Sequence, residues 1–274
     1  MQVYVNSETA PLRAVLLGFI DNFKLHEPVN SVQQYYFKHD PPRHDLLVEQ
    51  YGRFVETLEN YDVQVFRYDR EPGNMNRPFA RDAFTVIHDT LVVCSMKNRP
   101  GPNVKGVLAE IENPLLQADK GIVEGGDIIL DRDVLYVGLS QRTDLKGLQW
   151  FGEKLNIEVQ PLELKPDFLH LDVAFNLLGK NIALIHPPAF EEASLDILKK
   201  RYRLFEVTAE EQFSLGTNLF SLTPETVISE KRLNRINDFL RKEGFDVITI
   251  DYSEVSKLGG SFRCSTCPLV RDKL

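Results

Sequence analysis

Short apolar runs recur along the chain in pairs, and a tight polar turn separates the two members of each pair. For example, Phe84–Ile87 and Leu91–Cys94 flank a three-residue turn. Three further pairs have the same form: Ile128–Leu130 with Val134–Val137, Val173–Leu178 with Ile182–Ile185, and Leu219–Leu222 with Thr226–Ser229. Apolar runs joined by two to five turn residues are typical of β-hairpins. We therefore predict four hairpins.

Apolar residues at helical spacing follow most of these hairpins. Leu145, Leu148, Phe151 and Leu155 form one such stripe, which is typical of an amphipathic helix. Similar stripes comprise Leu46, Leu47, Tyr51, Phe54, Val55 and Leu58; Leu195, Leu198 and Tyr202; and Leu233, Ile236, Phe239 and Leu240. Short apolar runs then close the units at Val63–Tyr68, Ile157–Val159, Leu204–Val207 and Val247–Ile250. Each unit is predicted to be strand–strand–helix–strand.

A constant spacing relates the units to one another. Asp82, Asp127 and Asp172 stand before successive hairpins at intervals of 45 residues, and two further steps of 45 reach Thr217 and Phe262. Stacked in a row, such units would form a solenoid, and around an axis they would form a propeller. Only a ring brings polar residues at equivalent positions together. We therefore predict one five-bladed α/β propeller domain over residues 1–274.

The fifth unit is assembled from both ends of the sequence. Leu12–Gly18 supplies one strand, and the helix and strand that end near Tyr68 follow it. Its opening hairpin is less regular than the others. The C-terminal segment around Cys264 is expected to complete this unit.

Chemically capable side chains occupy the starts of the repeats. These are Asp82, Glu124, Asp127, His170, Asp172, Asn218 and Cys264. A cysteine with a histidine and carboxylates is a recognisable nucleophilic set, in which the thiolate attacks and the imidazole moves protons. Several carboxylates around a thiolate favour a cationic ligand. A planar guanidinium group matches them well, because carboxylates accept its N–H donors in pairs.

The overall charge narrows the classes of partner. The formal net charge is −8, from 32 Lys and Arg against 40 Asp and Glu, which argues against nucleic acid or an anionic membrane surface. The N-terminus lacks the features of a signal peptide, and no apolar run approaches the ~18 residues needed to span a bilayer. Three cysteines are too few for a disulfide framework. A cytoplasmic protein is expected.

Several cysteines, and Arg142, also have a purely structural interpretation. Cys264 and Cys267 form one Cys-x-x-Cys pair, which is half of a zinc site, and Pro268 follows at once where a redox helix would begin. We therefore expect no metal. Cys94 lies within a predicted strand and is interpreted as a core residue. Arg142 could also be an ordinary surface charge near Asp144.

Five stretches together resemble the arginine deiminase and amidinotransferase superfamily, whose members share the pentein fold. They are Asn76-Arg77-Pro78-Phe79-Ala80-Arg81-Asp82, Glu124-Gly125-Gly126-Asp127, Gly138-Leu139-Ser140-Gln141-Arg142-Thr143, His170-Leu171-Asp172 and Gly259-Gly260-Ser261-Phe262-Arg263-Cys264. No single stretch is specific, but they occur in the order of the superfamily over nearly the whole chain. The fold implied by the resemblance is a five-bladed α/β propeller.

The resemblance implies a role for each position. Cys264 would attack the guanidinium carbon, His170 would protonate the leaving amine and then activate water, and Asp82 and Asp172 would hold the guanidinium nitrogens. Glu124 would contact either the guanidinium or His170. The remaining implied substrate-binding residues are Arg142, which would hold the substrate carboxylate, with Asn76, Phe79, Asp127 and Arg81. The implied intermediate is an S-alkylthiouronium, and no metal or organic cofactor is implied.

The resemblance leaves several activities open. The first expectation is an arginine deiminase, which forms citrulline and ammonia, with complete hydrolysis to ornithine as a variant. The Gly-Leu-Ser-Gln-Arg-Thr stretch and the compact length look more like dimethylarginine dimethylaminohydrolases. An amidinotransferase would pass the amidino group to an amine instead of water. A non-catalytic propeller binding protein is the alternative from another class. Either a monomer or a homodimer is compatible with the sequence.

Overall fold

Each repeat folds as a β-hairpin followed by a third strand that runs parallel to the second. The computed structural model describes residues 1–21, 23–68, 73–97 and 111–273. In it β5 (Phe84–Ile87) pairs antiparallel with β6 (Thr90–Val93), and β7 (Leu115–Gln117) runs parallel to β6. The same order recurs in three further sheets, formed by β8 (Ile128–Asp131), β9 (Val134–Leu139) and β10 (Glu158–Glu163); β11 (Phe175–Leu177), β12 (Ile182–Ile185) and β13 (Arg203–Glu206); and β14 (Phe220–Ser221), β15 (Thr226–Glu230) and β16 (Asp246–Ile250).

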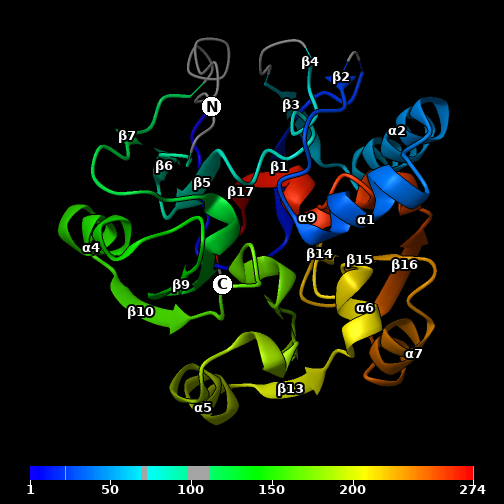
Figure 1. The fold of residues 1–274 in the computed structure, drawn as a ribbon. Coiled ribbons are helices and arrows are strands. Elements are labelled where there is room, and N and C mark those ends of the chain that lie inside the picture. Colours follow the sequence, from blue (N-terminus) through cyan, green and yellow to red (C-terminus); the bar gives the residue numbers. More distant parts are fainter. Residues whose placement is uncertain (22, 69–72, 98–110, 274) are drawn as a thin grey trace.

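The two ends of the chain share the remaining three-stranded sheet. β1 (Leu12–Leu17) pairs antiparallel with β17 (Thr266–Arg271) and parallel with β3 (Gln64–Arg67). The strand after Cys264 therefore completes the unit that the N-terminal strand begins, as the sequence predicts. The five sheets surround a common centre, which is the predicted five-bladed propeller (Figure 1). A short pair, β2 (Phe23–Lys24) and β4 (Gly73–Asn74), is added outside the repeats.

The long helices connect second and third strands and lie at the periphery of the ring. They are α2 (His44–Asn60), α4 (Leu145–Lys154), α5 (Glu192–Arg201) and α7 (Asn234–Lys242) (Figure 1). In α2 the predicted apolar stripe is buried, and Tyr51 and Phe54 pack in one cluster with Leu17 of β1. Burying such a side chain stabilises the fold by about 1.5–3 kcal/mol. The other three helices follow their hairpins as predicted.

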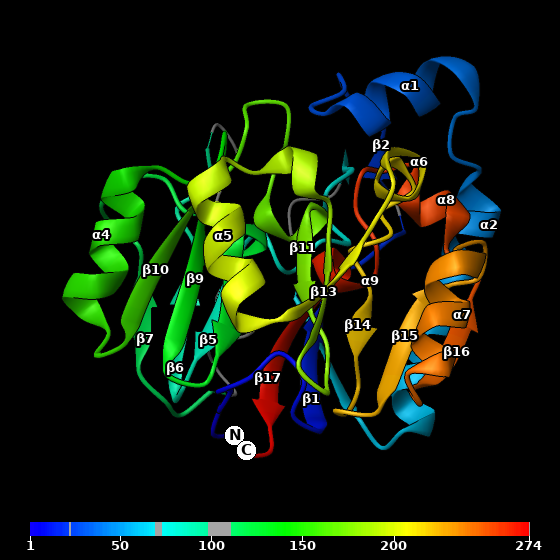
Figure 2. The ribbon, with the colours of Figure 1, turned by 90° about the horizontal axis from the view of Figure 1, so that it is seen from below.

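Short elements gather at one end of the propeller, and both termini lie at the other end (Figure 2). This end carries α1 (Ser31–His39) and α6 (Ala209–Phe213), and α8 (Ser253–Ser256) lies close to them. The starts of the repeats form η1 (Gly125–Asp127), η2 (Leu171–Val173) and α9 (Phe262–Ser265), while η3 (Pro187–Ala189) follows β12. Across the described ranges, every helix is too short or too polar to span a lipid bilayer.

Candidate active site

The starts of the repeats meet around one cavity, as a ring requires. It is called the catalytic cavity below. Six of the predicted site residues line it, namely Asn76, Phe79, Asp82, Arg142, His170 and Cys264. The remaining wall comes from Val29, Asn30, Leu169, Leu258, Gly259 and Gly260. Residues from four units and from the segment before α1 thus converge at one place.

Cys264 is held at the start of the strand that closes the ring. It lies in α9, which is inside the ring in both views (Figures 1 and 2). The side-chain oxygen of Asn218 accepts hydrogen bonds from the backbone N–H groups of Cys264 at 3.0 Å and of Ser261 at 3.2 Å. The amide nitrogen of Asn218 donates to the backbone oxygen of Asp172 at 3.2 Å. One asparagine therefore fixes the cysteine turn relative to Asp172.

The thiol of Cys264 lies among carboxylates. Its Sγ is 3.5 Å from Oδ2 of Asp172, and its side chain is almost completely buried. Burial, reinforced by the negative charges of Asp172 and Asp82, raises the pKa of the Cys264 thiol well above its ordinary value. The thiol is therefore neutral at physiological pH until a positive charge comes close. A nearby cation would favour the thiolate.

His170 carries a positive charge inside the protein. Its Nε2 is 2.8 Å from Oε2 of Glu124, and its Nδ1 is 3.9 Å from Oδ1 of Asp82. Burial opposes the charged ring, but the hydrogen bond with Glu124 and the charges of Asp127, Asp82 and Glu124 outweigh it. Together they raise the pKa of His170 to about 9. An imidazolium at neutral pH is suited to donate a proton.

Glu124 links His170 to the rim of the cavity. Its second oxygen, Oε1, accepts from Nη1 of Arg142 at 3.3 Å and from the backbone N–H of Lys97 at 3.2 Å. The carboxylate is completely buried, and its backbone N–H contacts Oγ1 of Thr143 at 3.2 Å. Of the two contacts left open by the sequence, the structure shows the one with His170. Glu124 therefore orients the imidazole and also forms an ion pair with Arg142.

Asp172 presents one satisfied and one unsatisfied oxygen. Oδ2 accepts from Nη1 of Arg263 at 2.9 Å, whereas the buried Oδ1 has no hydrogen-bond partner among the described residues. A buried carboxylate oxygen without a donor is unfavourable by about 1–3 kcal/mol or more. A guanidinium N–H would satisfy it. This carboxylate is also the one nearest to the sulfur of Cys264.

Glycines allow the cavity walls to close. A Cβ atom on Gly126 would lie 2.7 Å from Nδ1 of His170, and one on Gly260 would lie 2.5 Å from the ring of Phe79. Both distances are below any normal contact with a carbon atom. The Gly-Gly stretches of the sequence therefore make room for the imidazole of His170 and for the ring of Phe79.

Besides Asp172 and Glu124, two further predicted site residues do not line the cavity. Asp127 is completely buried and accepts from the backbone N–H of Leu171 at 2.8 Å and from Oγ of Ser140 at 2.7 Å. Burial raises the pKa of Asp127 to about 7. Arg81 lies 3.7 Å from Glu8, within the interior. Their positions correspond to those of the other repeats, but their side chains support the loops that carry the site.

Three residues of the site carry atoms of the kind that bind metal ions. Asp82, Glu124 and His170 offer ligand atoms that lie within 4.8 Å of one another. However, Nε2 of His170 already contacts Glu124, and the other oxygen of Glu124 already contacts Arg142. A metal would have to break both contacts, so the donor set fits a proton-transfer group better than a metal centre.

The chain matches a known protein family along most of its length. The model of the family described as N,N dimethylarginine dimethylhydrolase, eukaryotic, matches residues 22–271. The chain belongs to this family. It is thereby a member of the pentein superfamily and an enzyme that acts on the carbon–nitrogen bonds of guanidino groups.

Relatives of this dimethylhydrolase family member include both hydrolases and transferases. The uncharacterized protein YkgA of Bacillus subtilis (strain 168) is 35% identical over 97% of this chain and 94% of its own length. An arginine deiminase of Mycoplasma capricolum is 31% identical over 56% of this chain, and the match spans only 48% of that deiminase. The amidinotransferase SxtG of Microseira wollei has a TM-score of 0.83 at 18% identity, covering 99% of this chain and 98% of its own. The last likeness shows the fold.

One buried side chain next to the site of this family member, Arg263, is assigned no role by the sequence. Arg263, buried next to the cysteine, donates to Asp172 at 2.9 Å, to Glu8 at 3.0 Å and to the backbone oxygen of Ile128 at 2.8 Å. Burial disfavours its charge, but Glu8 and Asp172 outweigh burial and raise the pKa of Arg263. No sequence signal distinguishes this arginine from a surface charge. Asn218 was marked only by its place at a repeat start.

Proposed function

We propose that the chain hydrolyses the guanidino group of L-arginine to give citrulline and ammonia, with Cys264 as the nucleophile. The observation that carries this proposal is the buried carboxylate of Asp172. Its Oδ1 has no hydrogen-bond partner among the described residues, and its Oδ2 lies 3.5 Å from the sulfur of Cys264. A guanidinium N–H bonded to Oδ1 would bring the guanidinium carbon beside the thiol.

The arrangement supports a two-step covalent mechanism. Asp82 and Asp172 would hold the guanidinium on either side, and its positive charge would favour the thiolate of Cys264 that the carboxylates otherwise disfavour. The sulfur attacks the guanidinium carbon, one carbon–nitrogen bond breaks, and the electron pair leaves on nitrogen. The His170 imidazolium protonates that nitrogen as ammonia departs.

Hydrolysis of the thiouronium completes the cycle. Neutral His170 would take a proton from a water molecule, which adds to the same carbon, and the carbon–sulfur bond then breaks to release citrulline. Glu124 would hold the imidazole in place through its 2.8 Å contact in both steps. Arg142 lines the cavity and would bind the substrate carboxylate, and Asn76 and Phe79 would enclose the aliphatic chain. The protonation state that His170 leaves in the first step is the one required in the second.

Dimethylarginine is the second candidate substrate, with dimethylamine as the leaving group. The match to the dimethylhydrolase family model supports it. The chemistry at Cys264 and His170 would be the same for both substrates.

The test is turnover of defined guanidino compounds by the purified protein. We would offer L-arginine, asymmetric dimethylarginine, agmatine and guanidinoacetate separately, with and without glycine as an amine acceptor, and identify products by mass spectrometry. Citrulline and ammonia from L-arginine are expected. Cys264→Ser should abolish turnover, whereas Cys267→Ser, a second buried cysteine that does not line the cavity, should retain it.

Each other result has a defined meaning. Citrulline from dimethylarginine alone would replace the first candidate with the second. An amidino group recovered on glycine would indicate a transferase. Turnover that persists in Cys264→Ser would refute the covalent mechanism.

A further inference from the structure

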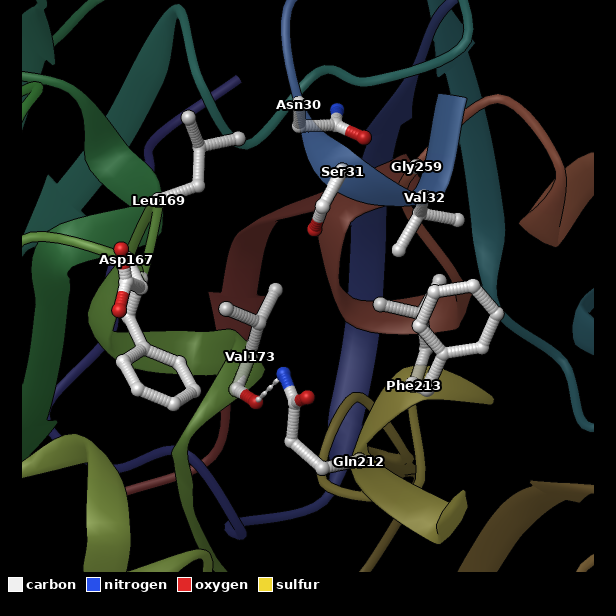
Figure 3. A pocket seen from close by; sticks show the side chains of 11 residues that line it. Asn30, Ser31, Val32, Asp167, Leu169, Val173, Gln212, Phe213 and Gly259 are labelled. Carbon is white, nitrogen blue, oxygen red and sulfur yellow. Dashed lines mark hydrogen bonds between the residues drawn. The ribbon is translucent and has the colours of Figure 1, made fainter. Parts of the chain in front are cut away.

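A second cavity adjoins the catalytic cavity and is called the outer chamber here. It has a volume of about 200 Å³, and it shares Asn30, Leu169 and Gly259 with the catalytic cavity. Figure 3 shows Val32 and Phe213 on one side of the chamber and Leu169 and Val173 on the other. The two cavities therefore adjoin at these three residues.

The outer chamber lies on the His170 and Asp172 side of the catalytic cavity. Leu169 and Val173, which line it, directly flank the segment that carries His170 and Asp172. By contrast, four residues that line the catalytic cavity do not line the chamber; these are Asn76, Phe79, Asp82 and Arg142. A substrate carboxylate at Arg142 and a group in the chamber would thus lie on different sides of the reacting carbon.

The chemistry of the wall indicates what the chamber binds. Val32 and Leu215 are buried, and Phe213 is partly buried, so much of the wall is apolar. Asp167 is exposed and adds a carboxylate to the wall. An apolar wall with one carboxylate fits an amine that carries an apolar substituent. This is the product expected when the departing guanidinium nitrogen is substituted.

We propose that the outer chamber receives an apolar substituent, larger than methyl, on the guanidinium nitrogen that leaves. This inference rests on the proposed function and names a further substrate class for the same site: arginines whose terminal nitrogen carries an alkyl group larger than methyl. Cys264 attacks the guanidinium carbon, the bond to the substituted nitrogen breaks, and His170 protonates that nitrogen. Water then releases citrulline, so the products are citrulline and one alkylamine.

Size supports the assignment. Ammonia is similar in size to a water molecule, which needs a cavity of about 10–15 Å³. The outer chamber has a volume of about 200 Å³ on the same measure. The chamber is therefore much larger than the exit of ammonia requires, and it accommodates a butyl or benzyl group.

Contacts between α6 and its neighbours fix the wall of the outer chamber. The ring of Phe213 packs edge-on against Tyr35 and is stacked on Tyr36, with centroid separations of 5.5 and 5.9 Å, which joins α6 to α1. Nε2 of Gln212 donates to the backbone oxygen of Val173 at 3.2 Å, which joins α6 to the segment after Asp172 (Figure 3). These contacts hold Phe213 at a defined distance from the segment of His170.

The test is a series of substrates that differ only in the substituent. L-Arginine and its Nω-methyl, Nω-butyl and Nω-benzyl derivatives would be assayed for kcat/KM by citrulline formation, with the released amine identified. We expect kcat/KM for the butyl and benzyl compounds to equal or exceed that for the methyl compound. Phe213→Ala should lower the benzyl-to-methyl ratio about tenfold or more, in line with the discrimination that apolar pockets achieve. Phe239→Ala, on the remote helix α7, should leave that ratio unchanged.

A binding measurement separates failure of this inference from failure of the proposed function. Benzylammonium would be titrated calorimetrically into Cys264→Ser, and into Cys264→Ser that also carries Phe213→Ala. Binding that weakens about tenfold in the double variant supports the chamber, even if L-arginine itself is not turned over. The inference is overturned if benzylammonium does not bind, or if the butyl and benzyl arginines react at least 100-fold more slowly than the methyl compound.

Discussion

The imidazole of His170 keeps its proton because the completely buried Glu124 accepts from it. Glu124→Gln removes that negative charge while keeping the size of the side chain, so we expect the pKa of His170 to fall from about 9 toward its ordinary value of 6.5. Titration of the histidine ring signals by NMR would measure the change. A midpoint that stays near 9 in the variant would show that Asp82 and Asp127, rather than Glu124, hold the proton.

Glu8 acts on Asp172 through Arg263, so a residue far from the cavity supports a residue next to the nucleophile. Glu8→Gln would leave the buried Arg263 without its 3.0 Å anionic partner. Removing one partner of a buried pair typically destabilises by about 3–5 kcal/mol. Chemical denaturation would measure this loss of free energy of unfolding.

Asp272→Asn is the matched control for the Glu8 prediction. It breaks the ion pair with Arg13, whose side chains are 57% and 41% exposed. Exposed pairs contribute at most about 1 kcal/mol. Equal losses in the two variants would contradict a structural role for the pair of Glu8 and Arg263.

At the scale of elements, the short helical turns at the repeat starts determine the precision of the site. Gly126 lies in η1, and a Cβ there would lie within 2.7 Å of the ring of His170 on η2. Gly126→Ala should therefore displace the imidazole and lower kcat at least about 100-fold, because small displacements of catalytic groups have effects of this size. Steady-state kinetics would measure the loss, and circular dichroism would check that the fold is kept.

A glycine in a helix interior provides the comparison. Gly152 is in α4, and nothing lies within 4 Å of a Cβ built on it. Gly152→Ala should leave kcat unchanged and raise the free energy of unfolding by about 0.5–1 kcal/mol, because alanine favours helices. If Gly126→Ala behaved in the same way, the close packing of η1 against His170 would have no functional importance.

The elements whose apolar residues follow a regular period could be predicted from the sequence, whereas helix α1, which lies beside the site, could not. The hairpin of Phe84–Ile87 and the stripe on α2 were recognisable because their apolar residues alternate or recur at helical spacing. α1 was not predicted, although Asn30 and Val32 line the outer chamber. Its sequence, Ser-Val-Gln-Gln-Tyr-Tyr-Phe-Lys-His, has no long apolar stripe, and its position depends on contacts such as that of Gln33 with the backbone oxygen of Leu258 at 2.7 Å.

At the scale of the whole molecule, the 45-residue spacing predicted which residues meet but not which way they point. Asp82 and Asp127 occupy equivalent places, yet Asp82 lines the cavity and Asp127 bonds Leu171 and Ser140. Exact fivefold symmetry is broken because the repeats differ in the loops before each strand. The contact of Arg263 with Glu8 joins positions 255 residues apart, and such contacts depend on closure of the ring rather than on any local pattern.

The stability of the whole molecule should report the buried imidazolium as a dependence on pH. The pKa of His170 is about 9 in the folded protein and 6.5 for an unperturbed histidine. The raised value means that the folded state binds the proton more tightly than the unfolded state. The resulting stabilisation is fully present below about pH 6.5 and is lost as pH rises through about 9.

We expect the difference in free energy of unfolding between the wild type and His170→Gln to shrink by on the order of 3 kcal/mol between pH 6 and 10. Urea denaturation of both proteins at several pH values would measure it. A difference that stays constant over this range would mean that the imidazole is neutral in the folded protein, and proton donation to the leaving amine would then require another group.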